Sequence, residues 1–239
     1  MPLDCLTGSV LVVPSISIAN IPQLASDLLI HTLNFSKVDS LSDKYLYPFA
    51  SPVDYTDKPS DGISLGLEVY YSKENNLTIL HQRSPLMPGF AAAHVEEVLV
   101  PFIKEGKFNH VVFLSLSDAG LVEHIAPGGI SIYTNEDILS DGLTKLHISE
   151  SDIQPLAKSP GSGSKYEEAL VKSLAASTNL SIFVSYVYEG DNFYDAQLLA
   201  SKVAGVLNVF PKAWKTPVSW FGVYGDKPAP LAIEEGMYG

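Results

Sequence analysis

The sequence predicts an α/β fold with three layers, in which helices flank a largely parallel central sheet. Three apolar runs, at residues 9–18, 110–116 and 180–187, have the length and the β-branched content of strands that are buried on both faces. Segments with helical spacing lie between such runs, and alternating strands and helices favour parallel strands joined by crossover helices. The composition agrees, because 46% of the 239 residues are hydrophobic and 18% are charged.

The first run leads into a helix. Asn20 is suited to cap this helix and Pro22 fits its first turn. Leucines repeat at helical spacing and predict the buried side, with Asp27 and His31 on the polar side. These leucines are Leu24, Leu28, Leu29 and Leu33.

Residues 35–63 lack a period and contain prolines at 48, 52 and 59, which predicts a long surface excursion with one short strand at 46–49. Residues 65–71 and 77–82 have strand composition and are joined by a polar pentapeptide. This pattern predicts a hairpin, which we expect to start a second sheet segment.

The remaining elements complete the alternation. Residues 90–104 predict an amphipathic helix kinked at Pro101, and residues 130–133 a short strand. The loop 117–120 follows a central strand, where ligands bind in open α/β sheets. The Gly-Ser-Gly-Ser-Lys run at 161–165 lacks the glycine spacing of a phosphate loop and predicts a linker with a helix cap. Helices are expected at 166–176 and 195–207, and the whole of residues 1–225 is expected to form a single domain.

Charge and composition exclude several functions. The net charge of -12, without clusters of Lys and Arg, argues against nucleic acid. The sequence lacks an apolar run of the ~18 residues that a membrane span needs. Its single cysteine, Cys5, cannot form an intramolecular disulfide and favours a reducing compartment. We expect a cytoplasmic protein that also enters the nucleus.

Catalytic patterns are weak. The histidines at 31, 81, 94, 110, 124 and 147 lack paired metal-ligand spacing and are expected at the surface or locally hydrogen-bonded. We therefore expect neither a catalytic site, nor a metal, nor a cofactor. The best polar cluster is Glu189, Gly190, Asp191 and Asn192. It is either a turn with Gly190 at positive φ and Asp191 or Asn192 as helix cap, or a small-molecule site at the edge of the sheet.

Residues 217–225 are rich in aromatics, including Trp220, Phe221 and Tyr224. They are either a last core strand that seats the following segment or an interface. Residues 226–239 contain two closely spaced prolines and are expected to form an extended tail, with a reach on the order of 45 Å.

The last three residues of the sequence, Met237, Tyr238 and Gly239, offer an apolar side chain, a phenol and a carboxylate. A partner pocket can capture such groups together. The alternative is a frayed end without a role.

Several stretches taken together resemble fungal members of the proteasome assembly chaperone 2 family. They are residues 13–24, residues 67–71 with 82–86, residues 189–192, and residues 217–225. The resemblance implies a noncatalytic protein that forms a heterodimer with the related proteasome assembly chaperone 1. It also implies binding to the outer face of the ring of proteasome α subunits, and a fold similar to nucleoside phosphorylases.

In that family, tails ending in a hydrophobic residue, a tyrosine and any third residue insert between α subunits. Met237, Tyr238 and Gly239 fit this pattern. The alternative is a nucleoside phosphorylase or hydrolase with Asp118, Glu189 and Asp191 in its site. The sequence offers no clustered arginines near these positions to hold a phosphate.

Overall fold

The computed structural model describes residues 3–121, 129–135, 153–156, 164–188, 190 and 192–221. Within them, one mixed and mostly parallel sheet has the strand order β2-β5-β6-β1-β7-β10-β8-β9. The strands are β1 (Val10–Pro14), β2 (Ser36–Ser40), β5 (Leu67–Ser72), β6 (Leu77–Gln82), β7 (His110–Asp118), β8 (Ile130–Thr134), β9 (Ile153–Pro155) and β10 (Leu180–Val187). A separate ribbon pairs β3 (Ala50–Pro52) with β4 (Ile63–Leu65).

The four central strands β6, β1, β7 and β10 are parallel, and β5 and β8 pair antiparallel at their two sides. Side chains of a strand alternate between faces, so successive residues of β1 enter different cores. Leu11 and Val13 pack on one side of the sheet, and Val12 packs on the other. This double burial explains why these strands are continuous apolar runs in the sequence.

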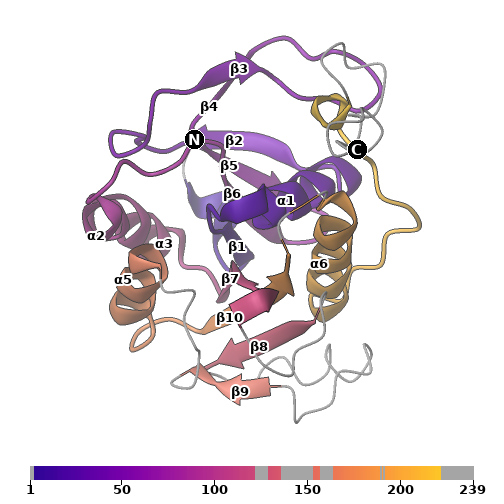
Figure 1. Cartoon of the computed structure of the whole chain (residues 1–239). Helices are drawn as coiled ribbons and strands as arrows, with labels where there is room; N and C mark the ends of the chain where they lie inside the picture. The colour runs from indigo at the N-terminus through magenta and orange to yellow at the C-terminus, as the bar shows by residue number, and fades with distance from the viewer. Residues whose placement is uncertain are drawn as a thin grey trace.

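Helices cover both faces, which confirms the predicted three layers (Figure 1). One face carries α1 (Ile21–Thr32) and α6 (Phe193–Val206), and the other carries α2 (Ala91–His94), α3 (Val100–Gly106) and α5 (Lys165–Leu174). Short 3-10 turns are η1 (Leu3–Leu6), η2 (Ile18–Asn20), η4 (Ala119–Leu121) and η7 (Val218–Trp220). We refer to the two sides as the α1 face and the α5 face.

The segment of residues 35–63 differs from its prediction. The expected surface excursion contains β2, which pairs with β5 and extends the main sheet, as well as β3. The short strand expected at residues 46–49 is reduced to an isolated bridge between Leu46 and Leu86. Edge strands pack on one side only, so β2 carries polar residues and lacks the apolar run of a central strand.

The predicted hairpin is present as β5 and β6, but it does not start a second sheet. β6 pairs parallel with β1, because the Val10 to Val12 backbone matches residues 77–79 in register. The hairpin therefore belongs to the central sheet.

The helix predicted for residues 90–104 is interrupted. A π-helical turn, η3 (Val95–Leu99), separates α2 from α3, and Pro101 lies in the first turn of α3. Proline lacks the N–H that would bond to the carbonyl four residues earlier, and such a gap is accommodated by a local change of helical pitch. At the place of the predicted kink, the helix changes from α to π geometry in the turn that precedes Pro101.

Candidate functional site

The site is organised around a buried acid. Asp27 is the one Asp or Glu of α1, and only 5% of its surface is exposed. The prediction that Asp27 lies on the polar side of this helix is wrong, because the sheet, α6 and Trp220 of η7 cover α1 on almost all sides. A buried carboxylate is stable only when it is paired and hydrogen-bonded.

Three side chains donate to Asp27. The Arg83 guanidinium lies 3.1 Å from Oδ1, and the indole Nε1 of Trp220 lies 3.4 Å from Oδ2. The ring Nε2 of His81 lies 3.2 Å from Oδ1. Burial raises the pKa of Asp27 to about 6, while the charge of Arg83 and the hydrogen bond from Trp220 limit that rise. At neutral pH the carboxylate is therefore ionised and held by its donors.

The contact between His81 and Asp27 is a hydrogen bond and not an ion pair. Burial lowers the pKa of His81 well below its ordinary value, and the positive charge of Arg83 lowers it further. The neutral ring can donate to Asp27 only from Nε2, which assigns its tautomer. The other ring nitrogen, Nδ1, is buried without a hydrogen-bond partner among the residues that the structure describes.

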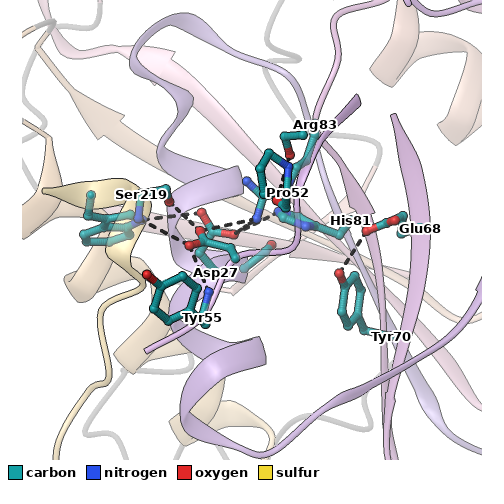
Figure 2. A network of polar contacts seen from close by, with 12 residues as sticks. Asp27, Pro52, Tyr55, Glu68, Tyr70, His81, Arg83 and Ser219 are labelled. Carbon is teal, nitrogen blue, oxygen red and sulfur yellow. Dashed lines mark hydrogen bonds and ion pairs between the residues drawn. The ribbon is translucent and has the colours of Figure 1, made fainter. Parts of the chain in front are cut away.

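A second acid, Asp54, extends the network to η7. Its carboxylate accepts from the backbone N–H of Ser219 at 3.3 Å and from the Ser219 hydroxyl, and Arg83 lies 3.7 Å away. The Val218 N–H donates to the Tyr55 carbonyl at 2.8 Å. Figure 2 shows Ser219 on one side of Asp27, and Arg83 and His81 on the other.

We call these residues the Asp27 cluster, namely Asp27, Asp54, His81, Arg83, Ser219 and Trp220. Trp220 also stacks on Phe193 of α6, with ring centroids 4.7 Å apart. The cluster therefore joins α1, the loop after β3, the end of β6 and η7. It fixes residues 218–220 to the body of the protein.

A neighbouring buried acid on β5 is satisfied locally. Glu68 forms an ion pair with Lys37 of β2, and it accepts from the Leu65 N–H and the Tyr70 hydroxyl. Burial and the charge of Glu68 raise the pKa of Tyr70, so this phenol stays protonated and donates (Figure 2). These contacts join β2 to β5 and satisfy Glu68 without a ligand. The Asp27 cluster is therefore the candidate site.

Two cavities meet at the Asp27 cluster, since Asp27, His81 and Arg83 line both. One, of about 720 Å³, lies toward β2 and the loop after β3, and its wall includes Asp54 and Tyr55. The other, of about 660 Å³, lies toward the start of α1 and is lined by Trp220 as well. Small-molecule sites have this size and a similar mixture of apolar walls and few polar groups.

The arrangement suits binding better than acid–base chemistry. The Asp27 carboxylate is engaged by three donors, so it is not free to take a proton from a substrate. Within the described part of the chain, His, Cys, Asp and Glu side chains do not gather into a group of three that could hold a metal ion. None of the described helices has the length and apolarity required to cross a bilayer.

The other predicted site residues are only partly described. Glu189, Asp191, Tyr224, Met237, Tyr238 and Gly239 lie outside the described residues, so their predicted roles stay predictions. Asn192 precedes α6 as predicted, but its side chain binds the preceding turn, accepting from the Gly190 N–H and donating to the Tyr188 carbonyl. Asp118 of the enzyme alternative accepts from the Gly120 N–H two residues away, which is a local turn contact.

The aromatic segment has a clear place. Residues 218–220 form the 3-10 turn η7, so the alternative of a last core strand is wrong for them. Trp220 is nonetheless a core residue at 8% exposure, and Phe221 is half-buried. The hydrogen bonds of η7 go to Tyr55 and Asp54 rather than to a strand, because the neighbouring positions of the sheet are already paired.

Sequence reasoning missed Asp27, Asp54, His81 and Arg83. Two of them carry a signal that was available: Asp27 is the one acidic residue of an apolar helix, and His81 interrupts the apolar strand β6. A charged or titratable residue inside an apolar element indicates a buried polar group that needs partners. Asp54 carries no such signal, because it lies in a polar segment.

The fold and the site together define a class: a three-layer α/β protein with a closed buried charge cluster at the carboxyl ends of its central strands. Residues 11–182 match the PAC2 family, and the chain belongs to this family. Proteasome assembly chaperone 2 of Saccharomyces cerevisiae is 26% identical over 91% of this chain and 95% of its own length. The human protein of the same name is 26% identical over 92% of this chain and 93% of its own.

Solved structures agree on the fold. The crystal structure of Pyrococcus furiosus PbaA, an archaeal homolog of proteasome-assembly chaperone, has a TM-score of 0.64 at 13% identity, covering 85% of this chain and 83% of that chain. Pyrococcus furiosus PbaB, an archaeal proteasome activator, has a TM-score of 0.59 at 15% identity, covering 85% of each chain. The names of the curated relatives describe a chaperone and no catalysed reaction, in agreement with the prediction that the chain is not an enzyme.

Proposed function

We propose that the chain is a proteasome assembly chaperone that acts in the cytoplasm and the nucleus. The observation that carries this proposal is the match to relatives named proteasome assembly chaperone 2, which covers more than nine tenths of this chain and of the yeast and human proteins. A match of this extent includes both α1 and α6 and is not limited to the strands that define the fold.

The finer proposal has two parts. The chain pairs with the related proteasome assembly chaperone 1, and the heterodimer binds the outer face of the α-subunit ring of core-particle precursors. Met237, Tyr238 and Gly239 insert between neighbouring α subunits, with the phenol in an apolar slot and the carboxylate on a basic group.

The Asp27 cluster supports this second part. It fixes residues 218–220 to the sheet, so the segment that follows starts from a set position on the body. A tether from a fixed point gives its end an effective concentration in the millimolar range for short linkers. Two such tails on one heterodimer would therefore raise the affinity for the ring by roughly a hundredfold or more over one alone.

A capture experiment tests the proposal. The tagged chain, co-expressed with its related chaperone, is isolated from cells in which core-particle precursors accumulate, and the bound α subunits are quantified. We expect Tyr238→Ala to lower recovery on the order of tenfold, because it removes the apolar ring and the hydroxyl together. Ile233→Ala is the matched control, since it shortens an apolar side chain of the same segment outside the final triplet.

The outcomes separate the two parts. Unchanged recovery with Tyr238→Ala would remove the final triplet from the mechanism while leaving the chaperone role. Absence of α subunits from every capture, including that of the unaltered chain, would contradict the chaperone role itself.

A further inference from the structure

The cavity of about 660 Å³ lies where an α/β fold commonly holds a ligand. It opens at the carboxyl ends of β1 and β6, next to the first turn of α1, and Gln23 of that turn is part of its wall. Ligands of open α/β sheets bind in the crevice outside the carboxyl ends of the strands. The position alone does not choose a ligand, but the chemistry of the wall does.

Three side chains that line this cavity carry buried polar atoms without a partner among the described residues. The atoms without a partner are Oε1 and Nε2 of Gln23, Nδ1 of His81 and Nε of Arg83. Gln23 is 92% buried, and its amide has neither a donor for Oε1 nor an acceptor for Nε2 in the described chain. These atoms have almost no surface that solvent can reach, so a molecule in the cavity contacts them only where the side chain turns toward it. A buried amide without partners is unfavourable, so a molecule that satisfies both amide atoms of Gln23 gains binding energy.

The charges of the wall are already balanced. Asp27 and Arg83 are the charged side chains of this wall, and they pair at 3.1 Å, whereas Asp54 belongs to the wall of the other cavity. His81 is neutral because burial lowers its pKa. An anionic ligand would meet the Asp27 carboxylate and a cation that this carboxylate already holds, and a cationic ligand would have to compete with Arg83. The wall therefore favours a neutral ligand.

The apolar part of the wall includes three aromatic rings. Trp220 and Phe193, stacked at 4.7 Å, line the cavity together with Phe49 and Leu24. Flat rings pack well against such surfaces. The cavity thus combines a planar amide that needs one donor and one acceptor with aromatic walls that favour a flat molecule.

We infer that this cavity is a binding site for a small, neutral, planar molecule with a carboxamide or lactam edge. The ligand's N–H donates to Gln23 Oε1, its carbonyl accepts from Gln23 Nε2, and its ring packs beside Trp220 and Phe193. The Gln23 side chain has three rotatable bonds, so its amide can turn to meet the ligand. This site is separate from the proposed contacts with proteasome subunits and stands without them.

Nicotinamide is a suitable probe because it is neutral and flat and carries a carboxamide. Nicotinic acid has the same ring with a carboxylate, and pyridine has the ring alone. The full chain, labelled with ¹⁵N, contains two tryptophans, so the indole N–H signal of Trp220 reports on the cavity and that of Trp214, which donates to Ser201, serves as an internal control. We expect a saturable shift of the Trp220 signal with nicotinamide, with a Kd on the order of 1 mM for so small a ligand.

A matched pair of variants assigns the site to Gln23. Gln23→Leu removes both amide atoms and should weaken nicotinamide binding about tenfold or more, and it should not lower the Tm because it also removes two unsatisfied buried groups. Gln197→Leu makes the same change on the exposed side of α6 and should bind as the unaltered chain does.

The probe comparison decides the inference even if Gln23→Leu fails to fold. A shift of Trp220 with nicotinamide, and a much weaker one with nicotinic acid and pyridine, supports the site. No saturable shift with nicotinamide, or equal shifts with all three probes, overturns it. Binding that survives Gln23→Leu would also overturn it.

Discussion

The two faces of the sheet each bury a histidine, and they treat it differently. On the α1 face, His81 donates to the ionised Asp27 within a cluster of charged groups. On the α5 face, His94 is fully buried between the rings of Tyr45 and Tyr166, at centroid distances of 6.5 and 6.0 Å. Neither His94 ring nitrogen nor the Tyr166 hydroxyl has a hydrogen-bond partner in the described chain.

The different surroundings of His81 and His94 show how each face of the sheet holds its buried polar side chains. On the α1 face, segments distant in sequence converge, and charged side chains with several donors and acceptors join them. On the α5 face, His94 stays neutral because burial lowers its pKa to about 4, and the buried acid Glu167 of α5 accepts a hydrogen bond from the neutral hydroxyl of Ser115 at 2.6 Å. The α1 face thus joins several charged side chains in one buried network, whereas the described titratable side chains buried on the α5 face contact neutral groups.

The largest expected effect tests the charged face. Arg83→Met should lower the free energy of unfolding by about 3–5 kcal/mol, because the Asp27 and Asp54 carboxylates lose their cation in a buried site. Urea denaturation at pH 7 measures the change. Lys44→Met is the control, since it breaks the exposed ion pair with Glu97 and should lower the free energy of unfolding far less than Arg83→Met does. Similar losses in both variants would show that the Asp27 cluster is not a stabilising junction.

The next effect tests the neutral face through pH. The folded pKa of His94 is about 4, below the ordinary value of 6.5, so the unfolded chain binds a proton first as the pH falls. Stability due to the neutral ring is therefore present above pH 6.5 and lost between pH 6.5 and 4. From pH 7.5 to 5 this loss amounts to about 2 kcal/mol.

His94→Leu should remove this dependence and leave a shallower decline of stability at acid pH. The measurement compares urea midpoints of the two proteins at pH 7.5 and pH 5. The raised pKa of Asp27 acts in the opposite direction, with stability gained as the pH falls through about 6, but it is common to both proteins and cancels in the comparison. Parallel pH profiles would mean that His94 is not buried in its neutral form.

The smallest effect isolates one bond of the cluster. Trp220→Phe keeps an aromatic ring beside Phe193 and removes the indole N–H that donates to Asp27. We expect a loss of about 1 kcal/mol in the free energy of unfolding, the usual net value of one hydrogen bond. Trp214→Phe removes the indole bond to Ser201 at an exposed position and should change stability less. A larger loss for Trp214→Phe would place the important anchor of this segment upstream of η7.

Much of the fold was predictable because its signals are local. The three apolar runs at residues 9–18, 110–116 and 180–187 each contain a strand of the central sheet. Ser164 caps α5 by accepting from the Tyr166 N–H, as the Gly-Ser-rich run before it indicated. The strand β2 was missed because an edge strand is paired on one side and tolerates polar residues, which removes the pattern that sequence reasoning uses.

The sequence by itself determined the alternation of the central strands with their covering helices and the three layers, since these depend on patterns that repeat within a few residues. Through its resemblance it also determined the family. Only the tertiary structure decided the site. Trp220 meets Asp27 across 193 positions of the chain, and Ser219 meets Asp54 across 165. Nothing local marks such pairs, because a buried carboxylate acquires its donors only when the folded sheet brings the end of β6 and η7 to the same side of α1.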